Sequence, residues 1–254
     1  MDLPVNRFKQ ALRAGRQQIG IWNALPDRSV VELLAGSGFD WMMLDTEHSA
    51  ADPITMLGLL QAVAPYPVAP VVRPASNDTV LIKRFLDVGA QTLLVPYVQT
   101  AAEAQAAVAA VRYPPRGVRG ISSISRATRF GRVAGYAARA DSEICLLVQV
   151  ETVETIERIE EIAAVDGVDG LFVGPGDLAA TLGYPGEPGR PEVVAVIEDT
   201  IRRIVAAGKP AGILTPDPAI ARRCIALGTT FTAVGIDAQI LARATEKLAA
   251  DFRA

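Results

Sequence analysis

Four side chains able to do acid–base or metal chemistry stand at the ends of short apolar runs. They are His48, Arg73, Glu151 and Asp177. Two carboxylates with waters suit a hard divalent cation such as Mg²⁺ or Mn²⁺, and an arginine presents a planar fork to a carboxylate. An imidazole titrates near neutral pH and can transfer a proton. Together these residue types indicate a site for a small oxo acid, with a metal on its oxygens, arginine stabilising an enolate and histidine moving a proton.

Each of these residues also has a simpler interpretation. His48 is the only histidine of the chain, and a lone histidine is commonly a surface loop residue. Glu151 and Asp177 both precede a helical segment, so either could be a helix cap or a first-turn acid. Asp177 suits that role, but Glu151 does not, because Thr152 follows it and caps better. The position of His48 beside three other charged strand ends favours a functional role.

The elements that must position these residues follow a regular alternation. Continuous apolar runs, typical of strands buried on both faces, alternate with longer helical patterns. The predicted strands are Gln18–Asn23, Trp41–Asp45, Val68–Arg73, Thr92–Pro96, Ile144–Glu151, Gly170–Gly174, Pro210–Thr215 and Phe231–Gly235. The predicted helices include Asp52–Ala64, Asp78–Asp87, Ala101–Val111, Thr152–Ala164, Glu192–Ala207 and Pro218–Leu227.

Eight strands that are each followed by a helix indicate a parallel sheet with crossover connections. At 254 residues a closed (β/α)8 barrel is favoured over a doubly wound sheet, with residues 1–254 forming a single domain. A short helix is predicted within residues 1–15, and another over Ala238–Phe252. Barrel enzymes carry their chemistry at the carboxyl ends of the strands, which is where the four residues stand.

One segment, Arg112–Ala140, breaks this alternation. It is rich in glycine, serine and arginine and has no clear period. Loops of this length are commonly functional or disordered. We expect the segment either to reach the mouth of the barrel or to touch a neighbouring subunit.

The composition excludes several other classes of function. The net charge is −3 and no aromatic platform accompanies the arginines, so no nucleic-acid partner is expected. No apolar run approaches the roughly 18 residues that cross a bilayer, and the N-terminus lacks the apolar region of a secretion signal, so we expect a cytoplasmic protein without membrane partners. Lys9, Lys83, Lys209 and Lys247 lie in helices or at the wrong end of the barrel, so none is placed for a Schiff base.

Motifs along nearly the whole chain point to one family. They are VELLAGSGFDWMMLDTEH, APYPVAPVVRP, LDVGAQTLLVPYVQTAAEA, RYPPRGVRG, LVQVET, VDGLFVGPGDLAATLGY and AVGID. In these motifs the chain resembles the HpcH/HpaI aldolase family, the metal-dependent class II pyruvate aldolases. That resemblance implies a barrel of the phosphoenolpyruvate/pyruvate superfamily type.

The resemblance also implies roles for residues in the reaction. His48 is expected to be the proton acceptor, Arg73 to stabilise an enolate-like transition state, and Asp87 to raise the basicity of the histidine. Glu151 and Asp177 are expected to bind a divalent metal ion, Mg²⁺, Mn²⁺ or Co²⁺. No organic cofactor is expected.

For the substrate, the resemblance implies that Arg73, Gln149, Gly176 and Asp177 contact the oxo acid. Leu214 is expected to line the pocket for the acceptor aldehyde. Gly176 departs from the alanine that is usual in similar members of the family. Its backbone amide is retained, so this contact is still expected.

Two acids compete as the partner of His48. Asp45 lies three residues away at the same strand end, whereas Asp87 is the acid that the resemblance implies. Asp87 ends a predicted helix, and the helices of this barrel run from the mouth to the base. Within one subunit Asp87 should therefore lie far from His48, and we favour its belonging to a neighbour's active site across an interface.

The implied activity is reversible cleavage of a 4-hydroxy-2-oxo acid to an aldehyde and pyruvate, or a close 2-oxo acid such as hydroxypyruvate, as in aromatic catabolism. A homo-oligomer is expected, a hexamer or trimer of dimers, in which Ala238–Phe252 either packs on a neighbour or serves as an ordinary eighth helix. Two alternatives remain open at this point. One is a metal-dependent, citrate-lyase-like lyase acting on a thioester, and the other is a catalytically silent barrel used for binding or assembly.

Overall fold

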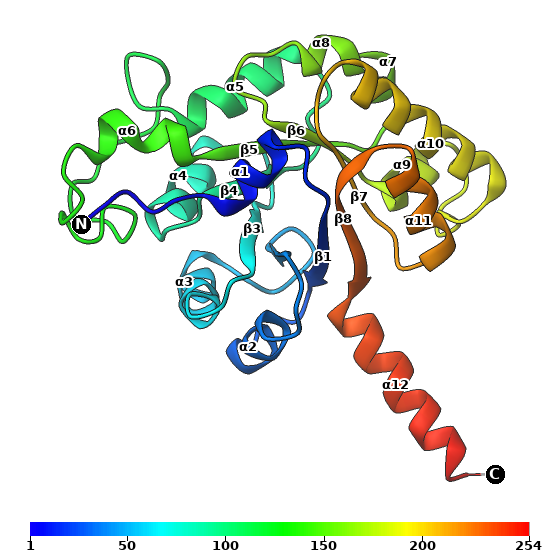
Figure 1. Ribbon diagram of the computed structural model, residues 1–254. Helices are drawn as coiled ribbons and strands as arrows, with labels where there is room; N and C mark the ends of the chain where they lie inside the picture. The colour runs from blue at the N-terminus through cyan, green and yellow to red at the C-terminus, as the bar shows by residue number, and fades with distance from the viewer. Residues whose placement is uncertain (254) are drawn as a thin grey trace.

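The computed structural model describes residues 1–253 and arranges eight parallel strands in a closed barrel (Figure 1). Each strand pairs with its sequence neighbours, and the last strand closes on the first. The strands are β1 (Gln18–Asn23), β2 (Trp41–Asp45), β3 (Ala69–Arg73), β4 (Thr92–Val95), β5 (Cys145–Val150), β6 (Gly170–Val173), β7 (Ala211–Leu214) and β8 (Thr229–Ile236). The predicted (β/α)8 barrel is therefore confirmed.

Helices cover the outside of the barrel. They are α1 (Arg7–Arg13), α2 (Arg28–Ala35), α3 (Pro53–Val63), α4 (Thr79–Asp87), α5 (Ala101–Val111), α6 (Tyr136–Glu143), α7 (Val153–Glu157), α8 (Ile159–Ala163), α9 (Pro175–Thr181), α10 (Pro191–Ala206), α11 (Pro218–Ala226) and α12 (Asp237–Asp251). The single helix predicted over Thr152–Ala164 is wrong in one respect, because the chain breaks at Arg158 into α7 and α8. Within residues 1–253, none of these helices has the length and apolar character required to cross a membrane.

Local sequence explains where many of these helices begin. Aspartates precede four of them, and each carboxylate accepts hydrogen bonds from first-turn amides, which would otherwise have no partner. These caps are Asp27, Asp52, Asp78 and Asp217. Because each cap lies in the loop after a strand, it fixes the path of the chain at the mouth of the barrel.

The interior of the barrel is filled from the amino end. Phe8 of α1 is fully buried and makes edge-to-face contacts with Trp41 of β2 and Phe231 of β8, with ring centroids 5.8 and 5.7 Å apart. A second apolar layer lies between the strands and the surrounding helices. With the base plugged by α1, the open end of the barrel is the one formed by the carboxyl ends of the strands.

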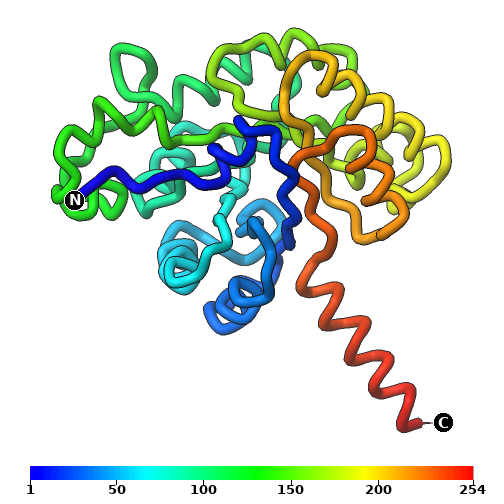
Figure 2. The backbone as a smooth tube through the Cα atoms, in the orientation of Figure 1, coloured from blue at the N-terminus to red at the C-terminus, as the bar shows by residue number. Residues whose placement is uncertain are grey.

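The segment Arg112–Ala140 lies at the base of its own subunit, and its last residues form the start of α6. The Ala127 amide donates to the Asp87 carbonyl oxygen at the end of α4, and the Met1 ammonium donates to the Arg132 carbonyl oxygen, at 3.1 and 3.0 Å. Figure 2 shows the N-terminus beside this segment. The expectation that the segment reaches the mouth is therefore wrong within one subunit.

Helix α12 projects away from the barrel instead of covering it (Figures 1 and 2). Among the described residues of this helix, only Asp237, at its start, is buried. Large apolar side chains are exposed along it, at Ile240, Leu241, Leu248 and, just beyond its end, Phe252. The chain therefore does not use this segment as an ordinary eighth helix.

Candidate active site

A cavity of about 250 Å³ opens at the carboxyl ends of the strands. It is bordered by side chains and backbone from β1, β2, β3, β5, β6, β7 and β8 and from the start of α9. Seven of the nine predicted site residues line this cavity: Asp45, His48, Arg73, Gln149, Gly176, Asp177 and Leu214. Glu151 lies directly behind it, and Asp87 lies elsewhere.

Arg73 is held rigidly at this cavity by two carboxylates. The parallel register places Asp45 of β2 beside Arg73 of β3. The guanidinium donates from Nε to Asp45 Oδ1 at 2.8 Å and from Nη2 to Oδ2 at 2.7 Å, and Nη1 lies 2.7 Å from Glu47 Oε2. Its central carbon also lies 4.8 Å from the centre of the Trp22 ring. The hydrogen bonds to Asp45 use two of the five N–H donors, and the ion pair with Glu47 holds Nη1 in place, so the remaining donors are preorganised toward a ligand.

The two carboxylates beside Arg73 differ in their pKa. Burial alone would raise the pKa of Asp45, but the hydrogen bonds and positive charge of Arg73 keep it below the ordinary value. For Glu47 burial prevails and the pKa is raised, although Arg73 opposes this. Asp45 is therefore the permanent counter-ion of Arg73, while Glu47 holds its proton more readily.

Glu151 is a buried carboxylate with a hydrogen bond to each oxygen. Oε1 accepts from the Tyr97 amide at 2.7 Å, and Oε2 accepts from Gln149 Nε2 at 2.5 Å. Burial raises the pKa of Glu151 to about 7; the negative charges of Glu47 and Asp177 add to the effect, and the Tyr97 amide opposes it. A carboxylate in these surroundings gains by having a cation nearby.

The surroundings of Glu151 fit a hard divalent cation. Gln149 Oε1 is buried without a hydrogen-bond partner, and Asp177 lines the cavity from the first turn of α9. A Cβ on Gly174 would lie 2.9 Å from both Gln149 Nε2 and Glu151 Oε2, so only glycine leaves these groups their space. Oxygen donors and unbalanced negative charge are what Mg²⁺ and Mn²⁺ require.

This set of protein ligands is small. In the part of the chain that the structure describes, no three acidic, histidine or cysteine side chains converge as a metal site. A cation beside Glu151 and Asp177 would therefore keep positions open for water and substrate oxygens, as magnesium sites commonly do. Asp177 also fulfils its simpler interpretation as a first-turn acid, so the two roles coexist.

His48 lines the cavity with its side chain 65% exposed. The carboxylate within ion-pair range is that of Glu47, with Oε2 3.9 Å from His48 Nε2. Both oxygens of Asp45 accept hydrogen bonds from Arg73, so this carboxylate has little remaining capacity to orient the imidazole. The pairing of His48 with Asp45 remains a prediction, and Glu47 is a neighbour that was not assigned a role from sequence.

Asp87 lies at the base of the barrel, where α4 ends. Its carboxylate Oδ1 is 3.1 Å from Nη2 of the buried Arg119, and its side chain is 25% exposed. This position agrees with the expectation that Asp87 and His48 of one subunit lie far apart. Its role in catalysis is a prediction.

Three residues at the mouth were not assigned roles from sequence. Glu47 directly precedes His48 in the sequence, and Trp22 lies within the apolar run Gln18–Asn23. Tyr97 follows β4 in a stretch without charged residues. For Glu47 the signal was its place in the run Asp-Thr-Glu-His, but no sequence pattern indicated Trp22 or Tyr97.

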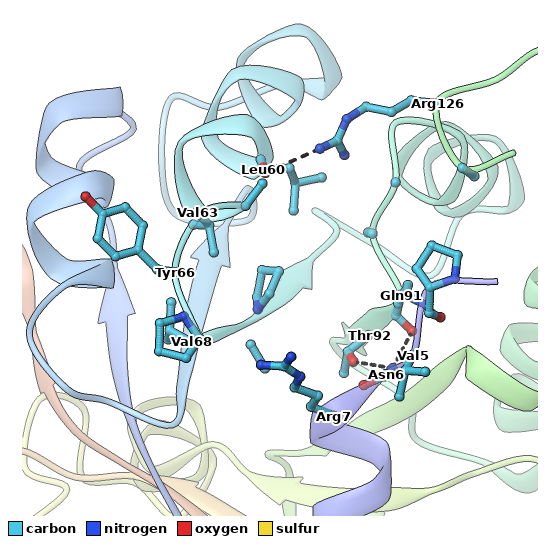
Figure 3. A pocket seen from close by; sticks show the side chains of 18 of the residues that line it. Val5, Asn6, Arg7, Leu60, Val63, Tyr66, Val68, Gln91, Thr92 and Arg126 are labelled. Carbon is cyan, nitrogen blue, oxygen red and sulfur yellow. Dashed lines mark hydrogen bonds between the residues drawn. The ribbon is translucent and has the colours of Figure 1, made fainter. Parts of the chain in front are cut away.

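A second cavity, of about 370 Å³, lies at the opposite end of the barrel, at the base. Figure 3 shows Arg7 and Arg126 on its walls, with Leu60, Val63 and Val68 forming an apolar side. No carboxylate and no histidine line it. It lacks both the metal ligands and a proton acceptor, so the predicted chemistry belongs to the cavity at the mouth.

Comparison with known proteins gives matches over the full chain. Residues 18–244 match the family described as HpcH/HpaI aldolase/citrate lyase. The chain is 65% identical over 252 residues to a pyruvate aldolase of Rhizobium etli, which covers 99% of both chains. It is 56% identical to a hydroxypyruvate/pyruvate aldolase of Pseudomonas aeruginosa, over all of this chain and 95% of that one.

Two further comparisons agree with these. A 4-hydroxy-2-oxo-heptane-1,7-dioate aldolase of Salmonella paratyphi B, a type of member that the sequence motifs also resemble, is 53% identical over 98% of this chain and 95% of its own. The crystal structure of an HpcH/HpaI aldolase/citrate lyase family protein from Burkholderia cenocepacia has a TM-score of 0.94 and 36% identity. It covers 98% of this chain and 100% of that one.

Proposed function

The chain belongs to the HpcH/HpaI aldolase/citrate lyase family and is an aldolase, and we propose that it performs class II pyruvate aldol chemistry at the mouth of its barrel. The supporting observation is the meeting of His48, Arg73 and Asp177 at one cavity, with the buried Glu151 directly behind it. The substrate is a 4-hydroxy-2-oxo acid. Its cleavage gives an aldehyde and pyruvate.

Glu151 and Asp177 would hold the divalent ion, Mg²⁺, Mn²⁺ or Co²⁺, which when bound supplies positive charge for the oxygens of the oxo acid. Arg73 stabilises the negative charge that develops as the carbon–carbon bond breaks, since its free N–H groups are already fixed in direction. The Gln149 side chain and the Gly176 amide contact the oxo acid.

His48 is the proposed base. It takes the proton from the 4-hydroxyl during cleavage and serves the pyruvate methyl group, C3, in the reverse direction. Because the imidazole is largely exposed, it can exchange protons with solvent between turnovers. Leu214, across the cavity on β7, contacts the aldehyde.

The space beside Gly176 supports hydroxypyruvate as a second donor. A Cβ built on Gly176 meets no atom within 4 Å, so the cavity has open room there. Hydroxypyruvate exceeds pyruvate by one hydroxyl oxygen. The name of the Pseudomonas aeruginosa relative, a hydroxypyruvate/pyruvate aldolase, supports the same assignment.

We further propose a cytoplasmic homo-oligomer, a hexamer built as a trimer of dimers. The exposed apolar side chains of α12 would pack on a neighbour, because a helix that stands off its own barrel has little to stabilise it. The segment Arg112–Ala140, at the base of the barrel, also exposes large apolar side chains. These are Val118, Ile121, Ile124 and Phe130.

Exchange of the pyruvate methyl protons in heavy water tests the proposed function. Enzyme with Mn²⁺ should exchange C3 protons without any aldehyde, and enzyme stripped with a chelator should not. Mg²⁺ or Co²⁺ should restore the exchange, which NMR follows directly. Borohydride with pyruvate should leave the protein unlabelled, because no Schiff base forms. Full exchange by the stripped enzyme would contradict the class II assignment.

The same assay separates the alternatives. A lyase acting on a thioester would leave pyruvate protons in place but release an acyl-thioester product from its own substrate. A catalytically silent barrel would neither exchange pyruvate protons nor release an acyl-thioester product, with or without metal.

Replacing Arg73 with lysine should lower kcat on the order of 10²-fold, because lysine keeps the charge but cannot hold Asp45 and Glu47 and also reach the substrate. Steady-state cleavage kinetics measure this. Arg223→Lys is the matched control, since Arg223 pairs with Glu198 on the outer helices. A change confined to KM would assign Arg73 to ground-state binding only.

A further inference from the structure

The backbone of Tyr97 is unusual. Its φ angle is +51°, in the left-handed region that residues other than glycine rarely adopt. It is exposed between the buried Pro96 and Val98, in the loop that follows β4. Such a conformation persists only where the surroundings impose it, and it is common at functional sites.

The consequence of this conformation is the direction of the Tyr97 amide. Pro96 has no N–H, so the first amide that β4 can offer at the mouth belongs to Tyr97. That amide donates to Glu151 Oε1 at 2.7 Å. With Gln149 Nε2 on the other oxygen, Glu151 is fixed between β4 and β5.

The side chain of Tyr97 reaches the second carboxylate. Its hydroxyl lies 3.4 Å from Asp177 Oδ1 and can donate to it. Tyr97 does not border the substrate cavity, whereas Asp177 does, so the phenol lies on the outer side of Asp177. One residue therefore contacts both carboxylates, one through its backbone and the other through its side chain.

We propose that Tyr97 is a positioning residue that orients Glu151 through its amide and Asp177 through its hydroxyl, and so sets the affinity for the divalent cation. Neither group touches the substrate. The inference rests on the proposed metal site. It adds a residue of the loop after β4, a strand that ends at the mouth in the apolar Val95.

Mn²⁺ binding to the substrate-free enzyme tests this, measured by the electron paramagnetic resonance signal of free Mn²⁺. Tyr97→Phe keeps the amide and loses the hydroxyl, so the Kd should rise about three- to tenfold, the range for one hydrogen bond. Tyr97→Gly also loses the phenol but tolerates φ of +51°, so it should match Tyr97→Phe. Tyr97→Ala should bind more weakly than both, because it strains the backbone without the ring.

The lost cleavage activity of these variants should be recovered by raising the Mn²⁺ concentration. Tyr66→Phe is the matched control, because the Tyr66 hydroxyl also donates to an acid, Glu32, at 3.3 Å, but in an exposed pair outside the mouth cavity. Its Kd for Mn²⁺ should equal that of the wild type.

The outcomes separate the two proposals. If the wild type binds no Mn²⁺, the proposed metal site fails and the role of Tyr97 fails with it. If the wild type binds Mn²⁺ and the three Tyr97 variants bind it equally well, only the role of Tyr97 is overturned. A changed KM for substrate with an unchanged Kd for Mn²⁺ would also overturn it.

Discussion

The Glu151→Gln variant should lose metal-dependent cleavage, yet its metal-free form should be more stable than the wild type at pH 8. The loss of activity at fixed Mn²⁺ should exceed about 100-fold, the upper range for residues that only support a metal ligand. The gain in stability has a separate cause. A glutamine carries no charge to bury.

The sign of the stability effect comes from the pKa of Glu151, which burial raises from 4.5 to about 7. Between these values the unfolded chain has released the proton while the folded protein keeps it, so stability falls as pH rises through this window. Above pH 7 the folded protein bears the full free-energy cost of burying a charged carboxylate. Glu151→Gln removes that cost, on the order of 3 kcal/mol at pH 8, and the two proteins should converge near pH 4.

The fold should accept this substitution. A glutamine can still accept from the Tyr97 amide, but its own amide group would then face Gln149 Nε2. Since Gln149 Oε1 has no partner, the Gln149 side chain can turn over and restore the hydrogen bond. The variant should therefore be folded, and its loss of activity can be assigned to the missing charge.

Thermal unfolding of the metal-free proteins at pH 5 and pH 8 measures the effect, with Mn²⁺ titration as the companion measurement. Glu160→Gln is the control, because Arg203 lowers the pKa of Glu160, so this exposed residue should show no gain at pH 8. A metal-free Glu151→Gln protein less stable than the wild type at pH 8 would contradict the argument. Wild-type affinity of the Glu151→Gln protein for Mn²⁺ would also contradict it.

The strands and their carboxyl ends could be predicted because buried parallel strands leave continuous apolar runs that end in polar residues. Once the strands are known, a closed barrel brings their ends together, so His48, Arg73, Gln149 and Asp177 could be placed at one mouth from the sequence. The contacts between these side chains could not be predicted from the sequence. Whether Asp45 faces His48 or Arg73 depends on the register of β2 and β3.

Other features leave no pattern in the sequence. A tyrosine with positive φ looks like any exposed aromatic residue, so Tyr97 had no signal. The break at Arg158 has no proline or glycine to mark it. The apolar pattern of α12 is the same whether the helix packs on its own barrel or on a neighbour, so only the fold distinguishes the two.

His48 and Asp87 are placed at opposite ends of the barrel, which shapes the last prediction. A base and the acid that orients it must lie within hydrogen-bond distance. Asp87 is partly exposed at the base, and the segment Arg112–Ala140 contacts it through Arg119 and Ala127. The same segment exposes large apolar side chains. We therefore expect a neighbouring subunit to bring its Asp87 to this subunit's His48.

Pyruvate C3 exchange in heavy water should fall on the order of 10³-fold in His48→Ala, the range for a lost general base. Asp87→Asn should lose much of the exchange, because the imidazole loses the carboxylate that raises its basicity. Asp45→Asn should also lose exchange, but through a loosened Arg73, so it should lower kcat without moving the pH profile of the histidine. Wild-type exchange by His48→Ala would exclude the histidine as base.

Mixed oligomers then locate Asp87. When His48→Ala and Asp87→Asn subunits are unfolded, mixed in equal amounts and reassembled, about a quarter of the sites should pair an intact His48 with an intact Asp87 of the next subunit. Activity should therefore rise above that of either variant alone. A site contained in one subunit cannot recover this way, because every subunit carries one defect. Mixed oligomers verified by mass spectrometry that stay inactive would exclude the shared site.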